Sequence, residues 1–302
     1  MTQRHIPVLQ QEVLEVLRPT ESDTYVDLTA GFGGHASLVL DRLGPKGQAY
    51  LVDQDEVALQ ALHDVFKDDA RVHIYRSNFA DIDWNDIPSP NMVLADLGVS
   101  SAQLDDGERG FSFQQDAPLD MRMDQAKGQT AAELLAELDE RDIADLLWRY
   151  GEEKRSRQIA RAIVQARTGQ PIQTTLQLAD TVRAQYPKGY HRIDPATRTF
   201  QALRIVVNHE LAVIERMLDA ALEALAPGGR LAVISFHSLE DRIIKQKMRD
   251  ITRDICDTIT GQALQESEFR LVTKKPLTAA PNEIDYNPRA RSAKLRAVEK
   301  KK

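Results

Sequence analysis

Hydrophobic and polar positions in the first hundred residues alternate between two periods. Four short apolar runs predict buried strands, at residues 24–28, 48–52, 71–75 and 91–95. The segments before and between them carry apolar residues at helical spacing and predict helices at residues 8–17, 36–43 and 56–66. Pro7 is expected in the first turn of the first of these helices. Strands that alternate with helices in this way favour right-handed crossovers and a parallel sheet.

This alternation stops after Asp96 and returns only near residue 230. Residues 107–124 have a loop-like composition, and Thr130 and Thr174 each open a capping-box pattern that predicts a helix. Apolar residues from Leu203 to Leu225 recur every three or four positions, which predicts one buried helical face. We therefore predict an α/β domain formed by residues 1–106 and 201–302, interrupted by an all-helical subdomain at residues 107–200.

Composition narrows the class of protein. With 42% hydrophobic and 28% charged residues, the 302-residue chain has the balance of a folded protein, which excludes a disordered chain, a coiled coil or collagen. No apolar run reaches the roughly 18 residues that a membrane span needs, and the first residues have no signal-like apolar region. Cys256 is the only cysteine, so we expect no internal disulfide and a cytoplasmic location.

Charge is unevenly distributed along this chain of net charge −7. Residues 141–204 hold 12 Lys and Arg against 6 Asp and Glu, and residues 285–302 hold 7 against 2. Such segments suit a phosphate-bearing partner, although a run of charge is also typical of a solvated helix face. The candidate phosphate contacts are Arg155, Arg157, Arg161, Arg192, Arg198, Arg289, Arg291 and Lys294.

Candidate ligand residues follow successive strands of the predicted sheet. Gly31, Gly33 and Gly34 lie in the turn after the first strand, and Asp53 ends the second strand 22 positions after Gly31. Phe79 follows the third strand and Asp96 ends the fourth. Glycines allow a ligand to approach the backbone, and a carboxylate about 20 residues later suits ribose hydroxyls. Each feature has a structural alternative (a tight turn, a helix cap, a core ring), but together they favour an adenosine-containing ligand at the strand ends.

The glycine turn also restricts the kind of nucleotide. It reads Gly31-Phe-Gly-Gly-His35, without the third glycine of a dinucleotide fingerprint, and the chain has no P-loop spacing. A dehydrogenase and an NTPase are therefore disfavoured. The strand that follows Leu225-Ala-Pro-Gly-Gly-Arg230 looks like the fifth strand of methyltransferases that use S-adenosylmethionine.

Longer strings make the resemblance specific. From His5 to Arg296, in the family's order, the chain resembles the bacterial RsmH (MraW) family of small-subunit rRNA cytosine-N4 methyltransferases. The strings that carry the resemblance are His5-Ile-Pro-Val-Leu9, Gly31-Phe-Gly-Gly-His35, Asp96-Leu-Gly-Val-Ser-Ser-Ala-Gln-Leu-Asp105, Glu108-Arg-Gly-Phe-Ser-Phe113, Pro118-Leu-Asp-Met-Arg-Met-Asp124, Pro195-Ala-Thr-Arg-Thr-Phe-Gln-Ala-Leu-Arg204, Ile234-Ser-Phe-His-Ser-Leu-Glu-Asp-Arg242 and Asn287-Pro-Arg-Ala-Arg-Ser-Ala-Lys-Leu-Arg296.

The resemblance implies a Rossmann-like class I methyltransferase sheet with an inserted helical domain. It further implies S-adenosylmethionine as the methyl donor. The implied acceptor is a cytidine in the decoding region of 16S rRNA, and the implied partner is this rRNA or the 30S particle that contains it. The cofactor contacts that it implies are Gly33, Gly34, His35, Asp53, Phe79, Asp96 and Gln103.

Two residues are candidates for catalysis. Asp96 could accept a hydrogen bond from the acceptor amine, and His237, after the strand at 230–236, could orient or deprotonate it or could simply cap the next helix. The aromatic residue that related aminomethyltransferases place after Asp96 is missing, so we expect the base to be covered by Phe236 or Phe111. The alternatives are a methyltransferase for another RNA, a protein or a small molecule, and an RNA-binding assembly factor with a vestigial cofactor site.

Overall fold

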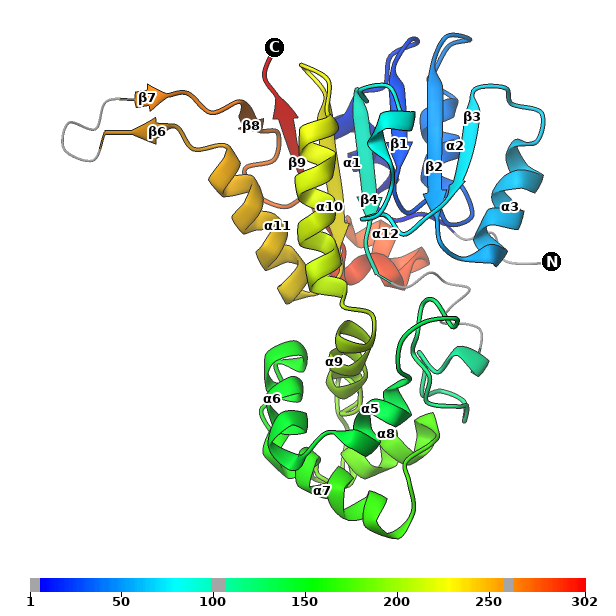
Figure 1. The fold of residues 1–302 in the computed structure, drawn as a ribbon, viewed down its shortest axis with the longest axis vertical. Helices are drawn as coiled ribbons and strands as arrows, with labels where there is room; N and C mark the ends of the chain where they lie inside the picture. Colours follow the sequence, from blue (N-terminus) through cyan, green and yellow to red (C-terminus); the bar gives the residue numbers. More distant parts are fainter. Residues whose placement is uncertain (1–5, 99–106, 258–262) are drawn as a thin grey trace. The chain divides into compact units, whose positions relative to one another are not determined.

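The computed structural model describes residues 6–98, 107–257 and 263–302. The chain forms two compact units, one consisting of residues 1–98 and 211–302 and the other of residues 99–210 (Figure 1). The sequence predicts boundaries at 106/107 and 200/201. The helical unit extends to residue 210 because α9 (Thr197–Val207) packs on α6 (Glu140–Gly151).

A seven-stranded sheet is the centre of the first unit, in the order β3-β2-β1-β4-β5-β9-β8. Its strands are β1 (Thr24–Asp27), β2 (Gln48–Asp53), β3 (Val72–Arg76), β4 (Met92–Asp96), β5 (Arg230–Ser235), β8 (Phe269–Leu271) and β9 (Lys294–Lys300). Strands β1 to β5 run parallel to one another, and β9 runs antiparallel to both β5 and β8. The predicted α/β class with a Rossmann-like sheet is confirmed.

Helices cover both faces of this sheet. Leu94 packs with α1 (Gln10–Leu17) and α2 (Gly34–Leu40) on one face, while its neighbour Val93 packs with α10 (Glu210–Ala224) and α11 (Ser238–Ile251) on the other. Successive strand residues point to opposite faces, so a strand covered on both sides must be apolar at every position. This explains why the sequence shows continuous apolar runs rather than alternation.

The unit has several further elements. They are α3 (Glu56–Phe66), α12 (Pro281–Tyr286), the 3₁₀ helices η1 (Trp84–Asp86) and η3 (Pro288–Ser292), and a two-stranded sheet of β6 (Ile255–Cys256) and β7 (Ala263–Gln265). No helix in the described parts of the chain is long and apolar enough to cross a membrane.

The second unit is helical and has its own hydrophobic core. Its elements are η2 (Gly107–Arg109), α5 (Ala131–Glu137), α6, α7 (Ser156–Gly169), α8 (Thr175–Arg183) and α9. Thr130 and Thr174 both form the predicted capping boxes, with Glu133 and Gln177 as their partners.

Two local predictions are wrong. The helical pattern from Leu203 to Leu225 is interrupted, because His209 takes a left-handed backbone (φ 52°) between α9 and α10. Pro7 does not lie in the first turn of a helix, since α1 begins at Gln10 after Leu9, which is also left-handed (φ 52°). The spacing of apolar residues does not reveal such a break, because the helix that follows one non-helical turn can bury the same face as the helix before it.

Candidate functional site

The strand order changes direction between β1 and β4, and open α/β sheets bind ligands beyond the strand ends at such a point. The turn after β1 is fixed there by its neighbours. The N–H of Leu28 donates to the carbonyl of Leu94, and the N–H of Ala30 donates to the carbonyl of Val52. The backbone that approaches a ligand is therefore held by both adjacent strands.

Glycines in this turn have different structural roles. Gly31 and Gly33 both have positive φ (53° and 76°). A Cβ at Gly33 would lie 2.6 Å from Cε2 of Phe66, whereas a Cβ at Gly31 would meet nothing closer than 3.9 Å. The packing of α3 thus requires a glycine at Gly33, while open space borders Gly31.

Asp53 joins the end of β2 to the glycine turn. Its Oδ2 accepts a hydrogen bond from the N–H of Gly31 at 2.8 Å, and its Oδ1 accepts one from the N–H of Asp55 at 2.9 Å. Burial raises the pKa of this carboxyl above its ordinary value. The 22-residue spacing seen in the sequence therefore corresponds to a direct contact, and the carboxylate, with about four lone pairs, keeps room for a further donor beside its backbone donors.

Asp96 ends β4 next to the same turn. Its N–H donates to Oγ1 of Thr29 at 2.6 Å, and its Oδ2 lies 3.8 Å from Nε2 of His35. Among the described residues the buried atom Oδ1 has no hydrogen-bond partner, although the side chain keeps 20% of its surface exposed. Burial, with smaller contributions from Asp27 and Glu240, raises the pKa of Asp96 to about 8.

A third carboxyl, Asp27, lies in β1 and was missed from the sequence. Its Oδ2 accepts a hydrogen bond from the hydroxyl of Tyr25 at 2.8 Å, and its Oδ1 accepts one from the N–H of Thr29 at 3.2 Å. Burial raises its pKa to about 6. An acidic residue inside an otherwise apolar strand was the available signal, because buried carboxylates are rare without partners.

The other predicted cofactor residues lie on different segments. Phe79 follows β3 and is half-buried against the face of the sheet that carries α10 and α11. Gly34 begins α2, and a Cβ there would lie 3.0 Å from Cγ of Pro7. Gln103 lies outside the described residues.

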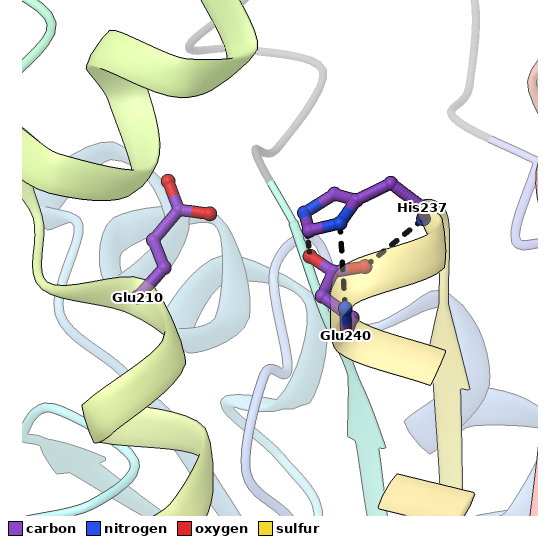
Figure 2. A group of neighbouring side chains, drawn as sticks. All are labelled: Glu210, His237 and Glu240. Carbon is purple, nitrogen blue, oxygen red and sulfur yellow. Dashed lines mark hydrogen bonds and ion pairs between the residues drawn. The ribbon is translucent and has the colours of Figure 1, made fainter. Parts of the chain in front are cut away.

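His237 is the N-cap of α11 (Figure 2). Its Nδ1 accepts a hydrogen bond from the N–H of Glu240 at 3.4 Å, and its Nε2 lies 2.9 Å from Oε1 of Glu240. The other carboxylate oxygen, Oε2, accepts bonds from the backbone N–H groups of His237 and Phe236. These contacts are those of the capping alternative: Nδ1 makes the cap hydrogen bond, whereas Nε2 lies beside the carboxylate and has no hydrogen-bond partner among the described residues.

The two candidate rings for covering the base lie in different units. Phe236 is half-buried after β5, and its Cδ2 lies 3.5 Å from where a Cβ of Gly98 would be. Phe111 belongs to the core of the helical unit, beside the guanidinium of Arg109.

Several of the basic candidates already have partners within the chain. Arg161 pairs with Glu140 at 3.5 Å, and Lys294 pairs with Asp241 at 3.3 Å. Arg155 donates to the carbonyl of Gln185 and lies over the ring of Tyr186. Arg157, Arg192 and Arg198 are exposed, and within the described ranges no ion pair is found for them.

The sequence matches the MraW methylase family over residues 2–301. It is 50% identical over 301 residues to the ribosomal RNA small subunit methyltransferase H of Xanthomonas euvesicatoria pv. vesicatoria, an alignment that covers 98% of this chain and 88% of the relative. It is 48% identical over 303 residues to the protein of the same name from Stenotrophomonas maltophilia, covering 98% and 93%. Among solved structures, an rRNA methylase from Streptococcus thermophilus aligns over 100% of this chain and 99% of its own at 10% identity and a TM-score of 0.46, too distant to bear on function.

Proposed function

Because the chain belongs to the MraW methylase family, we propose that it transfers a methyl group from S-adenosylmethionine to the N4 amine of a cytidine in the decoding region of small-subunit rRNA. The observation that supports this proposal most directly is the meeting of Gly31, Asp53 and Asp96 at the switch point of the sheet. A glycine turn and two carboxylates at that point suit a nucleoside that also carries positive charge.

The residues at this site fit the donor. Asp53 can accept from ribose hydroxyls, and it holds the N–H of Gly31, which opens the turn that leads into Gly33, Gly34 and His35. The buried Oδ1 of Asp96, which has no hydrogen-bond partner in the described part of the chain, suits the cationic methionine portion of the donor. Phe79 is the ring that we assign to the adenine, and Gln103 completes the proposed set.

S-adenosylmethionine supplies a methyl group on a positively charged sulfur, which an amine nitrogen can displace in line. The protein's part is to hold the acceptor nitrogen about 3–3.5 Å from the methyl carbon and aligned with it. The lone pair of a cytosine amine is delocalised into the ring, so an acceptor on the amine hydrogens would increase its nucleophilicity. Asp96 is our first candidate for this acceptor, in the ionised form that the positive charge of the bound donor would favour against the raised pKa, provided that its oxygens are not both occupied by the donor.

His237 is the second candidate for orienting or deprotonating the amine. Its engagement with Glu240 makes helix capping the competing role, and the two roles are separable by substitution. Phe236, beside Gly98, is the ring that we propose for covering the base, since it follows β5 at the same end of the sheet.

The acceptor cytosine has to leave its stack and its base pair before its amine is accessible. We propose that the basic residues of the helical unit, chiefly Arg157, Arg192 and Arg198, contact the rRNA backbone. This assigns the enzyme to the cytoplasm, with rRNA or the 30S particle as partner.

The decisive experiment is mass spectrometry of 16S rRNA from cells with and without this protein, followed by methylation of the unmodified rRNA or 30S particle with purified protein. We expect one N4-methylated cytidine to disappear and to be restored in vitro. Methylation of a protein, a small acceptor or another RNA instead would contradict the proposed substrate. Failure to bind S-adenosylmethionine in calorimetry would favour an assembly factor.

A further inference from the structure

Tyr190 is unusually exposed for an aromatic side chain. It lies in the loop between α8 and α9, in the helical unit, and 92% of its surface is accessible. Ile193 in the same loop is 65% exposed. A tyrosine that contributes nothing to the core of its own unit is available for a partner, because aromatic rings are otherwise among the main contributors to burial.

Contacts of Tyr186 fix the N-terminal end of this loop. Its hydroxyl donates to Oε2 of Glu153 at 2.7 Å, and the guanidinium of Arg155 lies 5.1 Å above its ring. His191 packs edge-on against the same ring, with the centroids 5.7 Å apart. Nε2 of His191 also lies 2.9 Å from the carbonyl oxygen of Pro187, which closes the loop on itself.

Contacts of Asp194 fix the C-terminal end of the loop. Its carboxylate accepts from Nη2 of Arg183 at 2.8 Å and from the N–H of Ala196 at 2.8 Å. Both ends of the loop that carries Tyr190 are therefore held by hydrogen bonds. Such a loop loses less conformational freedom on binding a partner than an unrestrained loop would.

The charges around Tyr190 are positive. Lys188 and Arg192 flank it and are exposed, and neither has an ion pair among the residues that the structure describes. The nearest acidic residue in sequence, Asp194, is already paired with Arg183. An aromatic face between unpaired cations suits a base and its flanking phosphates better than an apolar protein surface.

We propose that Tyr190 stacks on an unpaired base of the RNA, while Lys188 and Arg192 contact the adjacent phosphates. This inference rests on the proposed rRNA substrate and adds to it a contact for single-stranded RNA within the helical unit. Stacking requires an unpaired base and is independent of salt, whereas phosphate contacts depend on salt and also occur on a duplex.

The test is a binding titration without methyl donor, using a short mixed-sequence oligoribonucleotide as a single strand and annealed to its complement. We expect Tyr190→Ala to weaken binding to the single strand about tenfold, with an unchanged salt slope and little effect on the duplex. Tyr190→Phe should bind like the parent. Arg192→Ala should lower the salt slope by about 0.7 on the single strand. Tyr286→Ala, which removes an exposed tyrosine of the other unit, is the matched control.

Equal binding of parent and Tyr190→Ala to the single strand would overturn the inference, as would an equal loss on both RNAs or a parent that binds neither. The proposed function is read separately, from methylation of small-subunit rRNA by the parent. A parent that methylates rRNA while Tyr190→Ala binds normally therefore refutes only the stacking contact.

Discussion

Tyr25 donates its hydroxyl hydrogen to Asp27 across 2.8 Å, and both side chains are buried within β1. Asp27 in turn accepts from the N–H of Thr29, whose hydroxyl oxygen accepts from the N–H of Asp96. A continuous set of hydrogen bonds thus connects the interior of β1 with the end of β4. The position of Asp96 therefore depends in part on two side chains that are almost fully buried.

Tyr25→Phe should lower the free energy of unfolding by about 1–3 kcal/mol, because it leaves a buried carboxylate oxygen without its donor. Chemical denaturation at neutral pH measures this change. Tyr286→Phe, at an exposed position, should stay within about 0.5 kcal/mol of the parent. If Tyr25→Phe has the same free energy of unfolding as the parent, the hydroxyl makes no net contribution to stability.

Asp96→Asn should change how stability depends on pH. The pKa of Asp96 is about 8 in the folded chain, so between about pH 4 and 8 the folded state holds a proton that the unfolded state has lost. The stability associated with this group is present at low pH and is lost as pH rises through the folded pKa.

The asparagine variant does not ionise, so it should gain stability relative to the parent as pH rises from about 4 to 9, by about 1.4 kcal/mol for each pKa unit of difference. Methylation should fall by about a hundredfold or more. Denaturation curves across this pH range check the first statement, and a parent–variant difference that is constant with pH would refute it.

Asp53→Asn should weaken binding of S-adenosylmethionine by about 10–100-fold, since one of the two carboxylate oxygens is replaced by a group that cannot accept. The variant also loses an acceptor for the N–H of Gly31 or of Asp55. Calorimetry measures the affinity, and Asp68→Asn, on the exposed surface after α3, serves as the control. Unchanged affinity would remove Asp53 from the ribose site.

Two substitutions separate the possible roles of His237. His237→Ala should lose about 1 kcal/mol of stability, and His237→Asn should recover most of it, because asparagine is a good N-cap. If His237 acts on the amine, methylation by the asparagine variant stays at least tenfold below the parent while cofactor binding persists. Parental activity of this variant would leave His237 with capping alone.

Binding of rRNA should weaken steeply with salt if the helical unit contacts phosphates. Arg157→Ala should reduce the slope of log affinity against log salt by about 0.7–0.9, because it removes an exposed cation with no ion pair in the described parts of the chain. Arg161→Ala should reduce it less, since Arg161 pairs with Glu140. A flat salt response of the parent would count against the electrostatic contact.

The five parallel strands β1 to β5 were predictable, because most of them are buried on both faces and therefore read as apolar runs. The sequence did not predict β8 and β9, which complete the sheet. The contact of Asp53 with Gly31 was also accessible, since spacing and strand ends together fix which residues meet. The pairing of Tyr25 with Asp27 was not, because hydrophobic pattern does not show which buried polar atoms find each other. The break at His209 was hidden for a similar reason: one left-handed residue leaves the spacing of the apolar face intact.

The placement of β9 has a consequence for how the chain reaches its native state. This strand is buried between β5 and β8, yet it is encoded more than fifty residues after β5. Until it has been synthesised and has docked, β5 presents an open row of backbone donors and acceptors to any other extended chain. Folding on the ribosome therefore cannot finish sequentially, and a message truncated before Lys294 would produce a protein prone to self-association rather than a smaller enzyme.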